Sequence, residues 1–359
     1  MKDFKIKKAL FLKTKNIGDA IILTASIAAL PSSYRFVDVV CLPHSEAIFK
    51  MNKRVRNIFV IPRDQFGFKK IFAYINLLRK LLIERYDLLA QFSIDWRGAF
   101  LARLLKVNIS VARSTDRRGS FWHHSFDCLA PSLDALRPMA EQDVDLLRAA
   151  NLYKKTIAPS YELDISHVDK KKLTNWLFKN NIQLSDKLVV IHASSRWKYK
   201  EIPVKIWSQI VDALKREKIN IVVAGSQADL KTNQLIYDGC QLKPVLTENF
   251  SLKDTATLYS LAHLVLTIDS MSTHLASAVK TPVISIFGPT NDKVWGPWKG
   301  KSKVIGLSAQ DAPMFSCRPC GMDGCEGSKI SQCLVQMDPQ KVVDHTLVML
   351  KVPKKDSFV

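Results

Sequence analysis

Apolar runs of strand length alternate with polar loops and helical stretches, and this alternation constrains the fold more than any other feature of the chain. Residues 8–13 form an apolar run of strand length, residues 14–19 form a loop that contains Gly18, and residues 20–30 form an apolar helical stretch. A strand, a glycine-containing loop and a helix are the opening unit of a parallel α/β sheet. The alternation restarts near residue 187. The sequence therefore predicts two consecutive α/β halves.

Each half has its own set of predicted elements. In the first half we expect strands at residues 36–42, 58–61 and 88–92, a helix at 66–85 and an irregular segment at 116–132. After a connector at residues 152–168, we expect strands at 187–192, 219–224, 264–268 and 283–287, and helices at 204–215, 252–262, 272–279 and 339–350. A length of 359 residues also suits two domains. We predict two Rossmann-like domains, residues 1–165 and 166–359, which face each other across a cleft and bind ligands beyond the carboxyl ends of their strands.

The charge of the chain predicts an anionic partner. Its 53 Lys and Arg residues outnumber 33 Asp and Glu residues, which gives a formal charge of +20. The first 150 residues alone contain 25 basic and 14 acidic residues, so the excess is spread over both halves. Nucleic acid, an acidic membrane surface or a phosphorylated substrate would suit this charge. No apolar run approaches the roughly 20 residues that span a bilayer, and the N-terminus lacks the pattern of a signal peptide, so we expect a cytoplasmic protein.

The segment after the predicted strand at 264–268 is the richest in chemistry. Asp269 and Ser270 end this buried strand, and the hydroxyl residues Ser272 and Thr273 open the next helix, followed by His274 and Leu275. Amides at a helix N-terminus together with hydroxyl groups form an anion site suited to a diphosphate. The same residue types also serve as simple helix caps, and the sequence leaves both interpretations open.

A second polar segment follows the strand at 187–192. His192 is followed by Ser194 and Ser195, and then by the cations Arg196, Lys198 and Lys200. Hydroxyls and cations at the carboxyl end of a strand could neutralise a phosphate or a leaving diphosphate. A solvated basic loop is the alternative.

The loop around Gly18 carries the third candidate. Gly18 is its only glycine, so neither the G-x-G-x-x-G fingerprint nor a GK[ST] phosphate loop is present. Asp19 is a carboxylate at a helix N-terminus in the first loop after a strand. It could be a helix cap, or a general base that accepts a proton from an acceptor hydroxyl.

Four of the seven cysteines lie close together near the C-terminus. They are Cys317, Cys320, Cys325 and Cys333. Four thiols in such a short stretch could hold a structural zinc ion, although their spacing is less regular than that of paired C-x2-C knuckles. Free structural thiols and an adventitious disulfide are the alternatives, and no metal is assigned to the site.

Taken together, these motifs resemble those of the bacterial lipopolysaccharide heptosyltransferases (glycosyltransferase family 9), whose fold is the two-domain GT-B fold. The resemblance extends from residue 9 to about residue 343. The residues that carry it are Gly18, Asp19 and Thr24; residues 196–200 with Pro203; Asp269 and Ser270 with His274, Leu275 and Ala276; Pro282; and residues 287–290 and 295–298. The cysteine-containing tail looks most like that of the heptosyltransferase III subgroup.

The resemblance implies a function and roles for individual residues. It implies an inverting, metal-independent transferase that moves heptose from ADP-heptose to the inner core of lipopolysaccharide, with Asp19 as the base and with no cofactor. The donor would be held by residues of the second domain: Ser194, Ser195, Lys200, Asp269, Ser270, Ser272, Thr273, His274 and Leu275. The first domain would bind a phosphorylated lipid A–core acceptor at the inner face of the inner membrane, with the helix at 66–85 as a candidate peripheral contact.

Three rival functions remain open, and one of them is a binding module without catalytic activity. A transferase of the same fold could use a different nucleotide sugar. The charge would also allow a nucleic-acid-binding protein, but the sequence has no helix-turn-helix signature, no paired zinc knuckles and no aromatic RNA-binding motif, so we expect no nucleic-acid partner.

Overall fold

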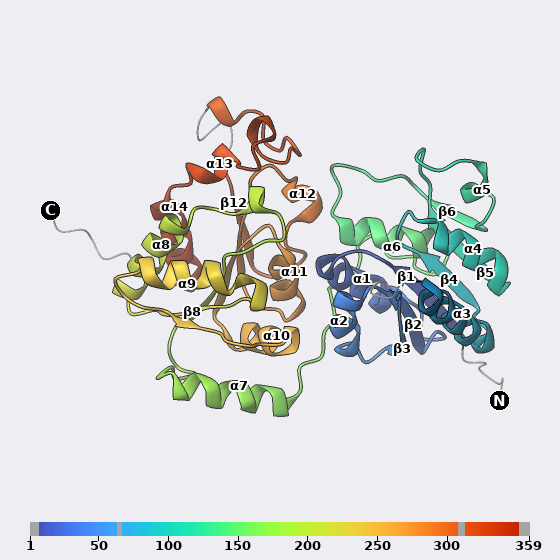
Figure 1. Cartoon of the computed structure of the whole chain (residues 1–359), viewed down its shortest axis with the longest axis horizontal. Coiled ribbons are helices and arrows are strands. Elements are labelled where there is room, and N and C mark those ends of the chain that lie inside the picture. Colours follow the sequence, from blue (N-terminus) through green and yellow to red (C-terminus); the bar gives the residue numbers. More distant parts are fainter. Residues whose placement is uncertain (1–6, 63–66, 308–312, 352–359) are drawn as a thin grey trace. The chain divides into compact units, whose positions relative to one another are not determined.

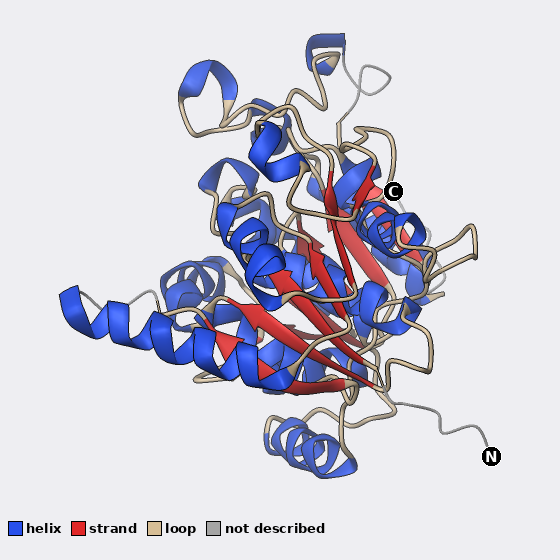
Figure 2. Ribbon diagram, turned by 90° about the vertical axis from the view of Figure 1, so that its right-hand side faces the viewer, coloured by secondary structure: helices blue, strands red, loops and turns tan. Residues whose placement is uncertain are grey.

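The computed structural model describes residues 7–62, 67–307 and 313–351, and it divides into two compact units (Figure 1). Unit 1 comprises Met1–Asp164 and unit 2 comprises Ile165–Val359. The boundary expected from the sequence lies between residues 165 and 166, one residue later. Both units are layered α/β structures with helices on the two faces of a parallel sheet (Figure 2).

Unit 1 contains six strands. They are β1 (Lys8–Lys13), β2 (Phe36–Cys41), β3 (Val55–Val60), β4 (Leu88–Gln91), β5 (Ile109–Arg113) and β6 (Cys128–Ala130). Its helices are α1 (Ile17–Ala29), α2 (Glu46–Lys50), α3 (Gly67–Glu84), α4 (Trp96–Leu105), α5 (Ser120–His123) and α6 (Met139–Ala149), with a 3-10 turn, η1 (Pro43–Ser45), before α2. Phe66, the first residue of the predicted helix at 66–85, lies outside the described residues.

The strand order of unit 1 is β3-β2-β1-β4-β5-β6, and all neighbours are parallel. This is the doubly wound Rossmann order, in which the chain direction across the sheet reverses between β1 and β4. One face packs against α3, α4 and α5 through a cluster that includes Leu81, Ala99 and Trp122. Central strands are buried on both faces, which explains why β1 and β2 are nearly continuous apolar runs.

The prediction of an irregular segment at residues 116–132 is wrong. The structure places the four-residue helix α5 and the three-residue edge strand β6 there. Elements this short span little more than one hydrophobic period, so periodicity does not reveal them. Trp122 of α5 is fully buried, and its ring nitrogen donates to the carbonyl of Arg113 on β5 at 3.0 Å, which fixes α5 to the sheet.

Unit 2 repeats the arrangement. Its strands are β7 (Leu188–His192), β8 (Asn220–Val223), β9 (Val245–Leu246), β10 (Leu264–Ile268), β11 (Val283–Ile286) and β12 (Ser302–Ile305). Its helices are α7 (His167–Lys179), α8 (Val204–Arg216), α9 (Leu230–Gly239), α10 (Leu252–Leu261), α11 (Met271–Ala278), α12 (Asp292–Trp295), α13 (Gln332–Val335) and α14 (Pro339–Leu350). The 3-10 turns are η2 (Lys198–Lys200), η3 (Gln227–Asp229), η4 (Pro313–Phe315) and η5 (Cys325–Gly327).

The sheet of unit 2 has the order β12-β11-β10-β7-β8-β9, again with parallel neighbours. When the strands of each unit are numbered along the sequence, this is the same doubly wound order as in unit 1, and the order reverses between β7 and β10. The amphipathic helix α8 buries Trp207, Ile210 and Leu214 in a core that β7, β8 and β10 share. The C-terminal helix α14 packs beside α8 and adds Val342 and Leu347 to this core.

Candidate active site

In both units the predicted site residues follow the strands at which the strand order reverses. Asp19 comes after β1 of unit 1, which neighbours β4. In unit 2, Ser194 comes after β7 and Asp269 comes after β10, and these two strands are neighbours. In open α/β sheets a crevice forms at such a reversal, beyond the carboxyl ends of the strands, and ligands bind there. The fold therefore places each predicted site residue where a doubly wound domain binds its ligand.

The two carboxylate oxygens of Asp19 have different surroundings. It is the third residue of α1, and its Oδ2 atom accepts a hydrogen bond from the backbone N–H of Asn16 at 3.2 Å. Its Oδ1 atom is buried and accepts no hydrogen bond from the described residues. The ammonium group of Lys13 lies 3.9 Å from this atom. One oxygen thus caps the helix, and the other is available to accept a proton.

Two charged residues that the sequence analysis did not identify lie beside this carboxylate. Lys13, the last residue of β1, is buried, and its Nζ atom lies 2.6 Å from Oδ2 of Asp143 on α6. Asp143 is separated from Lys13 by 130 positions along the chain. A lysine inside an apolar strand is a sequence signal for a buried ion pair, but nothing local in the sequence points to its partner.

In unit 2 the ends of β7 and β10 are joined by an ion pair. Nζ of Lys200, in the turn η2, lies 2.7 Å from Oδ2 of Asp269. Both side chains are mostly buried, with 17% and 10% of their surfaces exposed. The strands themselves are in register at Thr267 and His192, and the hydroxyl of Thr267 donates to the carbonyl of His192 at 3.1 Å. The cation predicted to face the donor phosphates is therefore anchored at the strand reversal.

Two polar side-chain atoms at the end of β7 have no partner among the residues that the structure describes. The Oγ atom of Ser194 and the Nδ1 atom of His192 are buried and form no hydrogen bonds with the described residues. Burial lowers the pKa of His192 below its ordinary value, although the Asp229 charge opposes this effect, so the imidazole is neutral at physiological pH. A buried polar atom without a partner is costly, and a bound ligand or water would remove that cost.

Ser195 is held by two hydrogen bonds, each between a backbone N–H group and a side chain. Its N–H donates to Oε1 of Glu201 at 2.9 Å, and its hydroxyl accepts a hydrogen bond from the N–H of Trp197 at 3.3 Å. Glu201 also pairs with Lys198 at 3.0 Å. These contacts fold residues 195–201 into a compact turn, and Glu201 is a structural member of the site that the sequence analysis missed.

The hydroxyl residues at the start of α11 have mixed orientations. Ser270 is the N-cap, and its side chain accepts a hydrogen bond from the N–H of Ser272 at 3.3 Å. The hydroxyl of Ser272 accepts a hydrogen bond from Tyr259 at 2.9 Å, and that of Thr273 bonds with Ser285 at 2.9 Å. These two side chains are fully buried and used internally, and the backbone N–H groups of both residues donate to Ser270, so what this helix start offers an anionic ligand is the positive end of the helix dipole. His274 is buried, and Leu275 is part of the apolar interior.

A pocket of about 470 Å³ beside β8 and β9 was not predicted from the sequence. Its walls include Leu230, Asn233, Leu246 and Glu248. Asn233 is buried, and neither its amide nitrogen nor its amide oxygen has a partner among the described residues. Gly225 lies against it, because a Cβ atom there would be 2.7 Å from the Asn233 amide nitrogen. The pocket thus presents a buried donor and a buried acceptor to a ligand.

The four C-terminal cysteines line one cavity of about 320 Å³ in unit 2. Cys317, Cys320 and Cys325 are exposed, whereas burial raises the pKa of Cys333 to about 11, and the neighbouring thiols add to this shift. In residues 7–62, 67–307 and 313–351, no three ligand side chains gather closely enough to hold a metal ion. The four thiols therefore line one shared cavity.

Two doubly wound domains, each with polar residues at its strand reversal, define the GT-B class of glycosyltransferases. The chain belongs to glycosyltransferase family 9 (heptosyltransferase), whose family model matches residues 74–322. It is similar to lipopolysaccharide heptosyltransferase 3 of Escherichia coli (strain K12), with 28% identity over 298 residues that cover 78% of this chain and 82% of that protein.

Solved structures agree with this assignment at the level of the fold. The glycosyl transferase family 9 structure from Veillonella parvula DSM 2008 has a TM-score of 0.81, with 17% identity and coverage of 97% of this chain and 98% of that one. The Escherichia coli heptosyltransferase WaaC with ADP has a TM-score of 0.70, with 15% identity and coverage of 95% and 99%. The predictions of a GT-B fold and of a family 9 glycosyltransferase are therefore confirmed.

Proposed function

We propose that the chain transfers heptose from ADP-heptose to the inner core of lipopolysaccharide. Membership of the heptosyltransferase family supports the type of reaction. The similar protein from E. coli is a lipopolysaccharide heptosyltransferase, and WaaC, which shares the fold, has been solved with ADP. The observation that carries the proposal is the buried Oδ1 atom of Asp19 at the strand reversal of unit 1, a carboxylate oxygen that accepts no hydrogen bond from the part of the chain that the structure describes.

The donor would bind to unit 2. Lys200, anchored by Asp269, supplies a positive charge for the diphosphate, and the N-terminus of α11 supplies the positive end of its helix dipole. The hydroxyl of Ser194 has no hydrogen-bond partner within residues 7–62, 67–307 and 313–351, and it is available to a phosphate oxygen. The pocket beside β8 and β9 would hold the nucleoside, with the amide of Asn233 as donor and acceptor. Ser195, Ser270, Ser272, Thr273, His274 and Leu275 would complete the donor site through their backbone or their packing.

The proposed reaction inverts the configuration of the transferred sugar in one displacement. Asp19 takes the proton from an acceptor hydroxyl, the resulting oxygen attacks the anomeric carbon of the heptose, and the bond from that carbon to ADP breaks. The leaving diphosphate takes the electron pair of the broken bond. Lys200 and the positive end of the α11 dipole stabilise its negative charge, which is the task that a divalent ion performs in other transferases. We therefore propose a reaction that needs neither a metal ion nor a cofactor.

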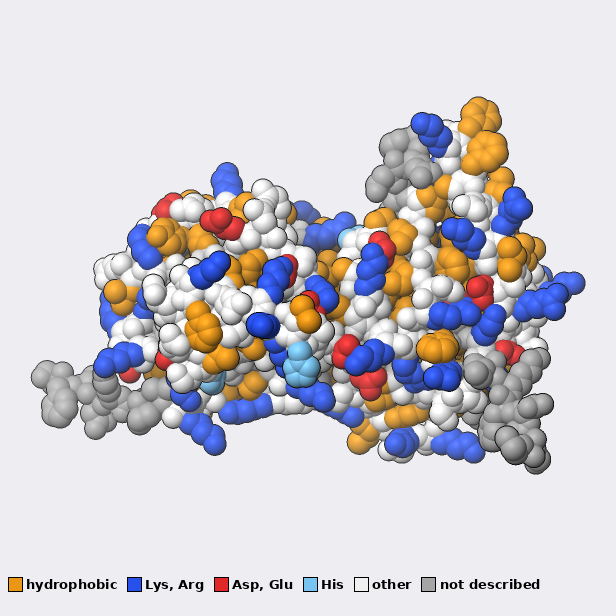
Figure 3. Space-filling view, turned by 90° about the horizontal axis from the view of Figure 1, so that it is seen from below, with side chains coloured by type: hydrophobic (Ala, Val, Ile, Leu, Met, Phe, Trp, Pro, Cys, Tyr) orange, Lys and Arg blue, Asp and Glu red, His pale blue; other side chains and the backbone are white. Residues whose placement is uncertain are grey.

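The acceptor is a glycolipid, and we propose that α3 brings the enzyme to the cytoplasmic surface of the inner membrane as a peripheral protein. Phe68 and Phe72 on this helix are 78% and 69% exposed, and Lys69 and Lys70 beside them are exposed as well. Figure 3 shows hydrophobic and basic side chains together on the projection that this helix forms beside a stretch drawn in grey. Such a surface suits the interface of an anionic membrane.

The neighbouring helices extend this surface. Trp96 and Phe100 of α4 both contact the ring of Phe121 on α5, with centroid distances of 5.7 and 5.3 Å. Arg103 and Arg118 lie over rings of this cluster at 4.6 and 4.9 Å. Aromatic rings and cations are the residues that proteins place at the water–lipid boundary. No helix in the described part of the chain is long and apolar enough to cross a membrane.

Calorimetry with ADP, UDP and GDP tests the proposed donor. We expect the purified chain to bind ADP more tightly than the other two nucleotides, and to turn over ADP-heptose with a truncated lipid A–core acceptor. Tighter binding of UDP or GDP would instead support a transferase of the same fold with a different nucleotide sugar.

A further inference from the structure

The surroundings of Asp19 contain a buried pair of opposite charges that the proposed mechanism does not use. Lys13 and Asp143 lie 2.6 Å apart, and their side chains are only 2% and 3% exposed. Burying two charges costs several kcal/mol per ion before their attraction is counted. If this ion pair served only to join β1 to α6, apolar residues could do the same at a lower cost. Its position beside a candidate base therefore suggests a role in the chemistry of that base.

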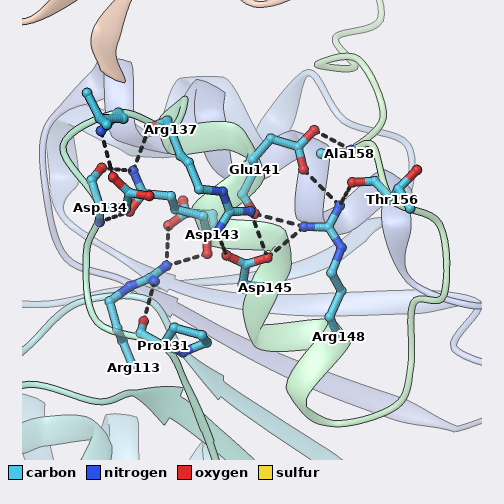
Figure 4. A network of polar contacts seen from close by, with 12 residues as sticks. Arg113, Pro131, Asp134, Arg137, Glu141, Asp143, Asp145, Arg148, Thr156 and Ala158 are labelled. Atoms are coloured by element: carbon cyan, nitrogen blue, oxygen red, sulfur yellow. Dashed lines mark hydrogen bonds and ion pairs between the residues drawn. The ribbon is translucent and has the colours of Figure 1, made fainter. Parts of the chain in front are cut away.

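The charges are arranged in a chain. Asp19 comes first, with Oδ1 at 3.9 Å from the ammonium group of Lys13. Lys13 is bonded to Asp143, and the guanidinium group of Arg113 on β5 lies 4.0 Å from the other oxygen of Asp143. Figure 4 shows Asp143 directed toward Arg113. The carboxylates of Asp19 and Asp143 thus alternate with the cations of Lys13 and Arg113, and Asp19 lies at one end of this row of charges.

Other groups near Asp19 complete its electrostatic environment. Lys15, in the loop between β1 and α1, is exposed and interacts electrostatically with Asp19, Lys13 and Asp143. Tyr161, which interacts with Asp143, is buried, and burial raises its pKa well above the ordinary value, so it remains neutral. The field at Asp19 is therefore set by Lys13, Lys15, Asp143 and Arg113.

Asp143 determines how strongly Lys13 acts on Asp19. At 2.6 Å it binds the ammonium group and cancels much of its field, whereas Asp19 is 3.9 Å away. Without Asp143, Lys13 would be free to form a direct ion pair with Asp19, which would stabilise the carboxylate and weaken it as a base. Without Lys13, Asp19 would face a second buried carboxylate, which would disfavour its charged form.

We propose that Lys13 and Asp143 are positioning residues that set the basicity of Asp19, with Asp143 holding the Lys13 ammonium group away from the base. This inference rests on the proposed role of Asp19 as the base of the transfer. It predicts that the two residues act on Asp19 in opposite directions. A purely structural role predicts no shift of the pH profile.

The pH dependence of kcat for heptose transfer by the full chain tests this proposal. Because Asp19 must be deprotonated to act, the acid limb of the profile reports its pKa. In Lys13→Met the limb is expected to move to higher pH by about one unit or more, and in Asp143→Asn to lower pH. The weaker base in Asp143→Asn should also lower kcat at neutral pH roughly three- to tenfold. Lys13→Arg, which keeps the charge, should restore a limb close to that of the wild type.

Asp145→Asn is the matched control. Asp145 is also a mostly buried carboxylate of α6, but it pairs with Arg137 and Arg148, each at 2.7 Å. Figure 4 shows it directed to these two arginines. Its replacement should lower stability much as Asp143→Asn does, while the acid limb stays in place. The affinity for ADP, measured by calorimetry, should change less than about twofold in all four variants, because the proposed donor residues belong to unit 2.

The outcomes separate this inference from the proposed function. In one outcome, Asp19→Asn abolishes transfer, but the acid limbs of the pH profiles of folded Lys13→Met and Asp143→Asn coincide with that of the wild type or move in the same direction. That result would overturn the proposed role of Lys13 and Asp143, whereas Asp19 would remain the assigned base. If Asp19→Asn retains wild-type transfer, the base assignment itself fails. Should Lys13→Met not fold, Asp143→Asn and Lys13→Arg still give the direction of the shift and its rescue.

Discussion

The ammonium group of Lys200 lies 2.7 Å from Oδ2 of Asp269, and this ion pair ties the turn η2 to the residue that precedes the cap of α11. The two residues follow different strands, β7 and β10, which are neighbours at the strand reversal of unit 2. The lysine is therefore held in place before any ligand arrives, and the ordering of its long side chain adds less to the cost of binding.

Replacing Lys200 by Met should reduce both donor binding and turnover. The variant loses the positive charge that we propose neutralises the leaving diphosphate, and removal of one such group typically costs about 10²- to 10³-fold in kcat. Lys205→Met, an exposed position at the start of α8, is the control. Steady-state kinetics with ADP-heptose should show the loss in Lys200→Met and near-normal rates in Lys205→Met. Equal rates in both variants would remove Lys200 from the mechanism.

Replacing Gly225 by Ala should weaken nucleotide binding. The new Cβ atom would lie 2.7 Å from both the Asn233 amide nitrogen and the Cβ of Asp229, so the pocket wall must shift. Overpacking of this kind costs about 1–3 kcal/mol, and we expect ADP affinity to fall about tenfold. Gly239→Ala, which would place its Cβ atom 2.6 Å from the hydroxyl of Ser208, should lower stability without changing ADP affinity in calorimetry. If the two variants bind ADP equally well, the pocket beside β8 and β9 does not hold the nucleoside.

The buried His192 should make unit 2 less stable in mild acid. Its folded-state pKa lies below its ordinary value because of burial, so the unfolded chain binds the proton more readily. Its contribution to stability is fully present above the unfolded pKa of about 6.5 and is lost as the pH falls from there through the lower folded pKa, with a slope of at most about 1.4 kcal/mol per unit. Urea unfolding between pH 7.5 and about 5.5 should therefore show a smaller loss in His192→Asn than in the wild type. Identical slopes would mean that His192 is not the residue responsible.

Membrane binding should depend on the exposed aromatic residues of α3. The double variant Phe68→Ser/Phe72→Ser should bind vesicles of phosphatidylethanolamine and phosphatidylglycerol at least about tenfold more weakly, since burial of one such side chain is worth roughly 1.5–3 kcal/mol. The control is Leu136→Ser/Val348→Ser, which removes two equally exposed apolar side chains elsewhere. Sedimentation with vesicles measures the bound fraction. A comparable loss in both double variants would argue against α3 as the contact.

Much of the fold was predictable because long, buried elements have strong periodic signals. The predicted helix at 339–350 has the same limits as α14, and the limits of β1 and β10 were predicted correctly as well. By contrast, β9 has two residues and β6 has three, and such short edge strands are too brief to show a pattern. The Rossmann-like class of both domains followed from the alternation of strands and helices, whereas the strand order came from the structure.

The candidate site was predictable only where its residues lie next to a strand end. Asp19, Ser194 and Asp269 were found in this way, because the loop after a parallel strand is where such folds place their ligand residues. The partner of Lys13 could not be found, because Asp143 comes from a helix far along the chain. The inward orientation of Thr273 was equally invisible, since a hydroxyl residue at a helix start can turn either way.

Transfer of heptose by Asp19→Asn, compared with the wild type, is the measurement that tests the central proposal most directly. The substitution keeps the size of the side chain and an oxygen that can cap α1, but it removes the ability to accept a proton. With ADP-heptose and a truncated lipid A–core acceptor, mass spectrometry should detect a heptosylated product from the wild type. In the variant the rate should fall by about 10²- to 10⁴-fold, with unchanged ADP binding and unfolding midpoint. Wild-type rates in Asp19→Asn, or the absence of any product from the folded wild-type chain, would contradict the proposal.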